Sequence, residues 1–251
     1  MFLPEEKAEN TRIQLVQFLK KSAPRIQEWQ SILGKLAHVS QVVTSGRVYL
    51  SSVYGVLRGI LSQQKHLRRR FTPEICEDLG TWMTLLCQPP EKNFSMLDNT
   101  VPIDHTLACD AAASIGFGAV FGKKWFVGQW PDEEWKTKNI AFLELYPIYL
   151  AIRIWVHKFT NSVLKVHTDN QSLVSVLNKL YSKDKDLRLL LKPIAKMALE
   201  QNFLVVACHV PGKKNVGPDL LSRGHITEFK QQYPFVNDTP DSIPDFIELP
   251  K

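Results

Sequence analysis

The sequence predicts an α/β fold, a mixed five-stranded sheet with flanking helices, preceded by a mainly helical segment. Three observations lead to this prediction. Apolar residues in positions 1–90 recur at three- and four-residue steps, which is the helical period. In positions 105–225, short apolar runs separated by turn residues are followed by longer helical stretches. Between these two parts, the adjacent prolines Pro89 and Pro90 exclude both helix and central strand, and we place a linker over residues 91–104.

The helical segment is expected to contain several amphipathic helices. The first should begin at Pro4, because a first helical turn does not need the donor that proline lacks. Residues 26–39 carry an apolar stripe, which residues 44–46 interrupt, and residues 50–61 continue the same spacing. We expect these stripes to form a core; the alternative is that they bind a partner.

A basic cluster follows these helices and contains Lys65, Arg68, Arg69 and Arg70. Such a cluster is either a solvated face or helix end, or a contact to nucleic-acid phosphates. The net charge of +6 and the pI near 9.1 favour a polyanionic partner, although many basic proteins bind none.

The second half is expected to begin with a meander and to continue with alternating helices and strands. The expected strands cover residues 107–110, 116–121, 125–130, 163–168 and 203–210, and the expected helices cover 140–158, 170–178, 184–202 and 219–223. Pro147 lies inside one of these helices and predicts a kink or a late start. A meander followed by strand–helix alternation predicts a sheet that is part antiparallel and part parallel.

The remaining features place the chain among soluble proteins. Residues 226–251 are rich in proline and aspartate and are expected to be extended or disordered. The four cysteines form no C-x-x-C pair and are expected to be reduced thiols in the core. We find no apolar run of about 20 residues and no secretory leader, and therefore expect an intracellular protein, cytoplasmic or nuclear, without a membrane partner.

Four acidic residues occupy strand ends and helices in this layout: Asp110, Glu144, Asp169 and Asp219. Strand ends and helix starts at one edge of a sheet can converge, although these residues are 34, 25 and 50 positions apart. Clustered carboxylates repel one another, and bound Mg²⁺ removes that penalty. Two such ions about 4 Å apart can support in-line displacement at a phosphodiester. Taken singly, each acid could instead be a turn residue, a helix cap or an exposed side chain.

The sequence around these acids resembles the RNase H domain of retroelement reverse transcriptases, most closely that of the DIRS-type elements, which encode a tyrosine recombinase. The resemblance covers about 115 residues and rests on four segments in the same order: Cys109–Val120, Leu143–Ile148, His167–Gln171, and His209–Asn215 with Asp219–Arg223. A weaker resemblance, over Leu33–His38 and Val42–Leu50, is to the thumb and connection region that precedes RNase H in these polymerases. It implies a domain of residues 1–90 that helps to grip the duplex, and an RNase H-like domain of residues 105–225.

The resemblance implies a hydrolase that cuts the RNA strand of RNA–DNA hybrids with two Mg²⁺ ions, for which Mn²⁺ can substitute. Asp110 would bridge both ions, Glu144 and Asp169 would complete the sites, and Asp219 would bind the second ion. His209 would assist proton transfer and product release; the alternative is that it caps a turn. The basic cluster and the motif residues Asn170, Lys213, Lys214 and Asn215 would contact the nucleic acid.

Two features depart from the family pattern. Pro218 stands where family members usually have alanine and could displace the Asp219 carboxylate. The polymerase motif Tyr-x-Asp-Asp does not occur, so the chain is expected to be a fragment or a domesticated descendant of a retroelement. A polymerase or recombinase of the same element would then be a partner.

Two other classes of function remain open. One is a nucleic-acid binding module that keeps the fold with weak or no catalysis, for which Pro218 and the missing polymerase motif are the reasons. The other is an interaction protein that uses its N-terminal helices and has no preference for hybrids over other polyanions.

Overall fold

The computed structural model describes residues 4–87 and 106–246, and the chain divides into two compact units. Unit 1 comprises residues 1–99 together with 179–183, and unit 2 comprises residues 100–178 and 184–251. The predicted linker over residues 91–104 lies outside the described residues.

Unit 1 is helical, as expected for the first ninety residues. Its α-helices are α1 (Glu5–Leu19), α2 (Ile26–Val39), α3 (Ser51–Leu57) and α4 (Pro73–Cys87), and its 3₁₀ helices are η1 (Thr44–Leu50) and η2 (Ser62–Gln64). The apolar stripe of α2 is buried, and the ring centroids of its Trp29 and of Phe18 are 4.8 Å apart. The stripes of α1, α2 and α4 therefore form a core, while the helix expected over residues 50–61 ends early, at Leu57.

The basic cluster lies in the loop between η2 and α4, where Lys65 is the C-terminal cap of η2. The loop runs antiparallel to the start of α2, where Ile26 N–H donates to Leu67 O and Arg69 N–H donates to Pro24 O. These backbone bonds fix the loop and leave its four basic side chains exposed.

Unit 2 is built on a mixed five-stranded sheet in the order β3-β2-β1-β4-β5. The strands are β1 (Leu107–Ala112), β2 (Gly116–Phe121), β3 (Lys124–Gln129), β4 (Val163–Thr168) and β5 (Leu204–His209). The pairs β1–β2 and β2–β3 are antiparallel, and the pairs β1–β4 and β4–β5 are parallel. This pairing confirms the predicted meander and mixed sheet.

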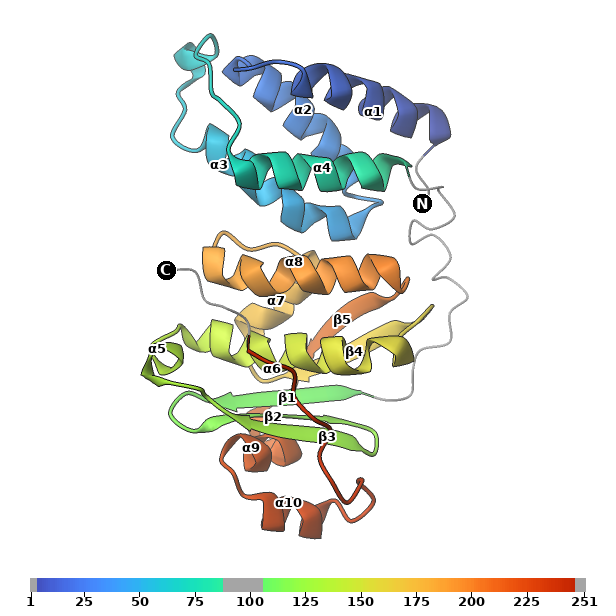
Figure 1. The fold of residues 1–251 in the computed structure, drawn as a ribbon, viewed down its shortest axis with the longest axis vertical. Coiled ribbons are helices and arrows are strands. Elements are labelled where there is room, and N and C mark those ends of the chain that lie inside the picture. Colours follow the sequence, from blue (N-terminus) through green and yellow to red (C-terminus); the bar gives the residue numbers. More distant parts are fainter. Residues whose placement is uncertain (1–3, 88–105, 247–251) are drawn as a thin grey trace. The chain divides into compact units, whose positions relative to one another are not determined.

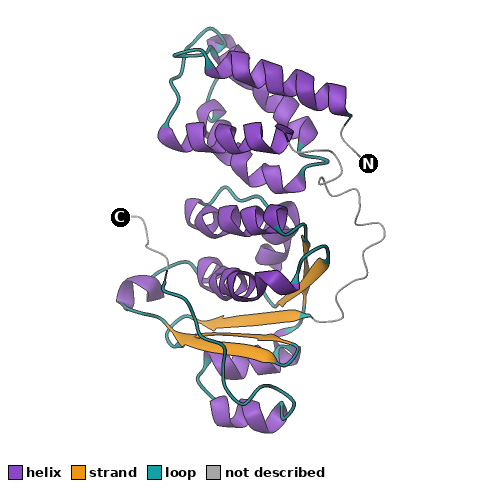
Figure 2. Cartoon of the chain, turned by 45° about the vertical axis from the view of Figure 1, so that its right-hand side comes forward, coloured by secondary structure: helices purple, strands orange, loops and turns teal. Residues whose placement is uncertain are grey.

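Helices cover both faces of this sheet (Figure 2). They are α5 (Glu133–Lys136), α6 (Ile140–Trp155), α7 (Gln171–Lys179), α8 (Lys185–Glu200), α9 (Val216–Ser222) and α10 (Ile226–Gln232), with 3₁₀ turns η5 (Val156–Lys158) and η6 (Gly212–Lys214). Helix α6 packs on β1, β2 and α8, whereas α9 packs on the opposite face against β1, β2 and β3. The late helix start considered because of Pro147 does not occur, since α6 runs through this buried proline.

Helix α6 with η5, Ile140–Lys158, is long and apolar enough to span a membrane by length and composition. Within the described residues it is the only such helix, and 61% of its apolar window is buried. Every residue from Phe142 to Ile152 is buried except Glu144. The helix is thus the core helix of unit 2, and its apolar surface is covered by the sheet and α8.

The segment after residue 225, which was expected to be extended or disordered, begins with a helix, and its residues up to 246 then lie outside helices and strands. Residues 226–232 form α10, and the chain then follows the edge strand β3, where Asn237 N–H donates to Lys123 O and Asp241 N–H donates to Trp125 O. The rings of Phe246 and Tyr146 stack with their centroids 5.5 Å apart. A sheet edge has unpaired backbone groups, and this segment satisfies some of them, which explains its order despite a polar composition.

All four cysteines are free thiols, as expected. The expected core location holds only for the buried Cys109; Cys208 is half-buried, and Cys76 and Cys87 on α4 are exposed.

Candidate active site

Asp110 and Asp169 lie at the end of the sheet where β1 and β4 separate. The parallel register pairs Ala108 with His167, so that two residues further along Asp110 is level with Asp169, which directly follows the last residue of β4. Asp110 was expected to be the last residue of its strand, but β1 continues to Ala112 through its pairing with β2. The carboxyl ends of the two parallel strands thus place both acids at one edge.

Glu144 reaches the same edge from α6. Its Oε2 atom is buried and has no hydrogen-bond partner within the described part of the chain. Burying a carboxylate oxygen without a hydrogen-bond partner costs free energy. A role in stabilising the fold therefore does not explain the position of Glu144.

Asp219 is contributed by α9, which sits very close to β2. A Cβ atom at Gly118 would lie 2.3 Å from Leu221 Cβ, so only glycine permits this approach. The approach brings the buried Ser222 to Asp110, and its Oγ lies 2.6 Å from Asp110 Oδ2. At the surface, Arg223 Nε donates to Asp219 Oδ1 at 2.9 Å.

Burial raises the pKa of Asp110 to about 6. The hydrogen bond from Ser222 lowers this pKa, whereas the negative charges of Asp169 and Asp219 raise it. Because the repulsion between two charges weakens with distance, these effects indicate that Asp169 and Asp219 lie near Asp110.

Burial also raises the pKa of Glu144, to about 7. A hydrogen bond from the Asn170 side chain lowers it, and the charges of Asp169 and Asp110 raise it. The four acids selected from the sequence therefore form one electrostatically connected cluster, in which Asp169 acts on both Asp110 and Glu144.

Two other selected residues border this cluster. His209, the last residue of β5, is exposed, and its Nε2 lies 3.1 Å from the backbone oxygen of Asp169. Asn170 caps α7 by accepting hydrogen bonds from the backbone N–H groups of Ser172 and Leu173. Both residues lie close enough to contact a molecule held at the carboxylates.

The loop before α9 has exposed and buried members. Lys213 and Lys214 are exposed on η6, and a Cβ at the neighbouring Gly212 would lie 3.1 Å from Asp169 Oδ2, which shows how closely this loop approaches the acids. Asn215, by contrast, is buried and donates to Cys109 O at 3.0 Å. Its amide anchors the loop to β1 and does not face solvent, where a phosphate would bind, contrary to the expected nucleic-acid contact.

Lys65, Arg68, Arg69 and Arg70 belong to unit 1 and are exposed there. They are not part of the carboxylate cluster, which lies entirely in unit 2.

Pro218 does not disturb the helix that carries Asp219. Helix α9 begins at Val216, earlier than expected, so that Pro218 lies in its first turn. Proline costs no helical hydrogen bond there. The Asp219 N–H still donates to Asn215 O at 3.1 Å.

Within the described residues, no group of three or more His, Cys, Asp and Glu side chains is arranged to hold a metal ion directly. The donor set is nonetheless suited to Mg²⁺, since all four side chains offer hard oxygen atoms and Glu144 Oε2 is buried without a partner. One carboxylate oxygen of Asp110 accepts from Ser222, and one of Asp219 accepts from Arg223.

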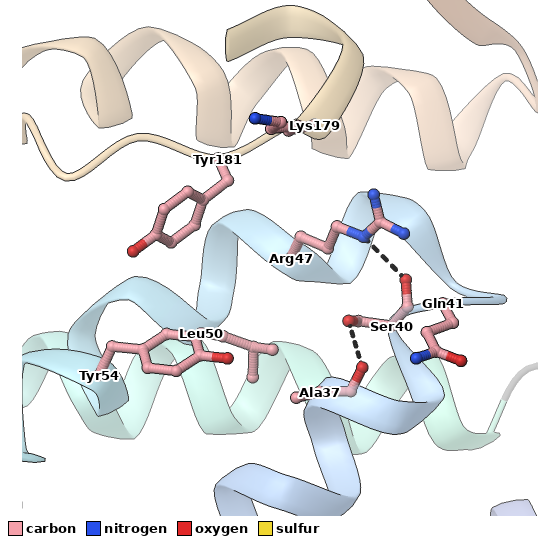
Figure 3. A pocket seen from close by; sticks show the side chains of 8 residues that line it. All are labelled: Ala37, Ser40, Gln41, Arg47, Leu50, Tyr54, Lys179 and Tyr181. Carbon is pink, nitrogen blue, oxygen red and sulfur yellow. Dashed lines mark hydrogen bonds between the residues drawn. The ribbon is translucent and has the colours of Figure 1, made fainter. Parts of the chain in front are cut away.

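Unit 1 contains a pocket of about 530 Å³ (Figure 3). Arg47 on its wall donates from Nε to Ser40 O, and Ser40 Oγ in turn donates to Ala37 O. Tyr54 and Tyr181 stand edge to face at 6.2 Å. The lining contains no carboxylate, so this pocket cannot supply the hard anionic ligands of a Mg²⁺ site.

Three residues that position the cluster were not assigned these roles from the sequence: Gly118, Ser222 and Asn215. Gly118 and Ser222 stand inside the motifs, yet nothing in their spacing says which atoms they approach. The position of Asn215 in the loop before α9 indicated that it belongs to the site. Only the packing of this loop on β1 shows that its side chain is buried.

The sequence matches no protein-family model and no curated protein.

Proposed function

We propose that unit 2 is an RNase H-type endonuclease that hydrolyses the RNA strand of RNA–DNA hybrids with two Mg²⁺ ions. The observation that carries this proposal is the convergence of Asp110, Glu144, Asp169 and Asp219, from β1, α6, the end of β4 and α9, into one cluster. Such a cluster concentrates negative charge at a sheet edge, where it is unfavourable unless cations bind.

Asp110, Glu144, Asp169 and Asp219 would hold the metal ions. When bound, the ions would polarise the scissile phosphate and lower the pKa of the attacking water. Asp110 and Glu144 must be deprotonated for this role, and their pKa values of about 6 and 7 allow it from about pH 7 upward.

The surrounding residues have roles of their own in this proposal. His209, held near the Asp169 carbonyl, is exposed and would assist proton transfer and product release. Lys213 and Lys214 would contact phosphates beside the acids, and Asn170 would contact the strand that lies over them. Recognition would depend on duplex shape and the 2′-hydroxyl and not on base sequence.

We also propose an evolutionary origin for the chain. The fold of unit 2 would be RNase H-like and derived from a retroelement reverse transcriptase, with unit 1 as its thumb and connection region. A polymerase or recombinase of the same element would be a candidate partner.

The test is cleavage of a hybrid with a labelled RNA strand by the full chain, with Mg²⁺, with Mn²⁺ and with chelator. We expect cleavage that requires the metal and is lost in Asp110→Asn, while this variant still binds the hybrid. Glu134→Asn, on the exposed α5, serves as a control and should cleave normally. Cleavage by Asp110→Asn at the wild-type rate would refute the proposal.

Metal binding has a second readout that does not depend on activity. Mg²⁺ should raise the melting temperature of the wild-type protein at pH 8, because it binds only the folded cluster. The increase should disappear in Asp110→Asn; an equal increase in both proteins would mean that Mg²⁺ binds elsewhere.

The second candidate is a nucleic-acid binding module without efficient catalysis. The ion pair between Arg223 and Asp219 favours it, since Arg223 competes for a proposed metal ligand. This candidate predicts salt-dependent binding that prefers hybrid to duplex DNA, without cleavage. The interaction-protein alternative predicts no such preference.

A further inference from the structure

A pocket of about 400 Å³ in unit 1 carries three arginines that converge from two segments. Arg58 follows α3, and Arg69 and Arg70 belong to the loop before α4. Ser52 and Thr72 complete the polar part of the wall, and Glu74 is the one acid in the lining. Three positive charges against one negative charge make the pocket attractive to anions.

The three arginines are not committed to ion pairs. No carboxylate within residues 4–87 and 106–246 forms a salt bridge with Arg58, Arg69 or Arg70. Within the same residues, the guanidinium group of Arg69 donates only to the backbone oxygen of Arg68. Like charges that share one pocket repel one another, so that a bound anion would relieve a cost that the fold otherwise bears.

Ser52 supplies an independent observation. It is only 9% exposed, it lines the pocket, and its Oγ has no hydrogen-bond partner within the described residues. A buried hydroxyl without a partner is unfavourable, and a ligand oxygen in the pocket would satisfy it.

The N-terminus of α4 adds a positive electrostatic potential, which favours an anion in the pocket. Thr72 precedes the fifteen-residue helix, and its Oγ1 accepts from Ile75 N–H at 3.3 Å. The pocket therefore lies at the positive end of the helix macrodipole, where a phosphate group is favoured. Guanidinium groups match the paired oxygen atoms of phosphate better than an ammonium group does.

We propose that this pocket binds one phosphate group of a nucleic-acid strand, through Arg58, Arg69, Arg70 and the Ser52 hydroxyl. The site goes beyond a diffuse basic surface, because it includes Arg58 and Ser52 and excludes the neighbouring Arg68. The choice of a nucleic acid as the source of the phosphate rests on the proposed function. The proposal that the pocket binds a phosphate group does not depend on the proposed function.

The first experiment is arginine-specific labelling of the full chain with phenylglyoxal, followed by mass spectrometry of each arginine. The probes are inorganic phosphate, an RNA–DNA hybrid, and chloride at matched ionic strength, all with chelator so that no cleavage occurs. Phosphate and hybrid should each protect Arg58, Arg69 and Arg70 at least threefold more than Arg68. Equal protection of Arg68, or equal protection by chloride, would overturn the proposal. Protection by phosphate without protection by the hybrid would overturn its assignment to a nucleic-acid strand.

Two variants extend the test. Arg70→Gln should weaken hybrid binding about tenfold and abolish the phosphate protection of Arg58, whereas Arg68→Gln, which removes the same charge outside the pocket, should preserve that protection. Ser52→Ala should weaken phosphate protection without lowering the melting temperature, since no intramolecular hydrogen bond is lost. Unchanged protection in both Arg70→Gln and Ser52→Ala would overturn the site. Because every readout is binding, failure of the phosphate site remains distinguishable from failure of the nuclease proposal.

Discussion

Ser222 is the residue that joins α9 to Asp110. Its hydroxyl lies 2.6 Å from Asp110 Oδ2 and 2.9 Å from the backbone oxygen of Asp219, so one side chain fixes two acids of the cluster. Because the hydrogen bond to Asp110 favours the charged carboxylate, Ser222 opposes the effect of burial. In the proposed enzyme, Ser222 is a positioning residue that does not itself contact substrate.

Replacing Ser222 by alanine should therefore raise the pKa of Asp110. Less of the carboxylate is then ionised below neutral pH, and the acid limb of the cleavage–pH profile should move to higher pH. We expect a loss of about three- to tenfold at pH 6.5 and a smaller loss at pH 8.5. Ser175→Ala, on the exposed side of α7, is the control. An equal loss at both pH values would argue for a structural role alone.

Glu144 makes the stability of the metal-free protein depend on pH. Its pKa is raised from 4.5 to about 7 in the folded state, so the folded chain holds a proton that the unfolded chain has released. Stability should therefore fall as pH rises from about 4.5 to 7 and stay low above that range.

Glu144→Gln removes this penalty. In chelator, the variant should be more stable than wild type at pH 8 by about 1–3 kcal/mol, allowing for the partial exposure of the side chain, with no such gain at pH 4.5. Urea unfolding at the two pH values measures the difference, with Glu134→Gln as an exposed control. A variant less stable than wild type at pH 8 would show that the carboxylate is not strained there.

At the scale of elements, the close packing of α9 on β2 determines where Asp219 and Ser222 lie. The contact requires glycine at position 118, because any side chain there would meet Leu221. The same face of the sheet buries Trp125, Leu220 and Phe229, so α9 is held by a small core of its own. Movement of α9 would separate the cluster before it unfolded the sheet.

Gly118→Ala should accordingly displace α9 and destabilise the protein by about 1–3 kcal/mol. Gly80→Ala is the matched control, because Gly80 lies inside α4 and an added Cβ there meets nothing within 4 Å. That control should gain about 0.5–1 kcal/mol from reduced backbone entropy. Denaturant unfolding measures both changes; equal behaviour of the two variants would contradict the inferred contact.

At the scale of the whole molecule, the C-terminal segment completes unit 2. It runs along β3, receives the Trp125 indole N–H at Asn237 O, and receives the Trp155 indole N–H at Asp241 Oδ2. Trp155 is 1% exposed, so its indole would otherwise be a buried donor without an acceptor.

Asp241→Ala should cost about 1–3 kcal/mol of stability, because it removes this acceptor and the ion pair with Lys124. Asp238→Ala should be near neutral, since Asp238 is exposed and is joined to Lys230 only through its backbone oxygen. Thermal unfolding distinguishes the two; a neutral Asp241→Ala would mean that the segment adds little to the fold.

The sequence by itself determined the local elements and the identity of the acids. Apolar periodicity located the five strands to within about two residues, because alternation and helical spacing are set by which side chains must be buried. The order of a meander followed by strand–helix alternation was enough to predict a mixed sheet. The strand ends and helices that carry Asp110, Glu144, Asp169 and Asp219 followed from the same pattern.

Only the tertiary structure decided which side chains meet. The carboxylate of Asp110 lies against Ser222, 112 positions away, because glycine at position 118 admits α9. Asn215 is buried where its side-chain N–H donates to Cys109 O on β1, and the C-terminal segment is ordered where its backbone bonds to the edge of β3. These contacts join residues distant in the chain, and their free energy depends on burial and geometry that local sequence does not encode.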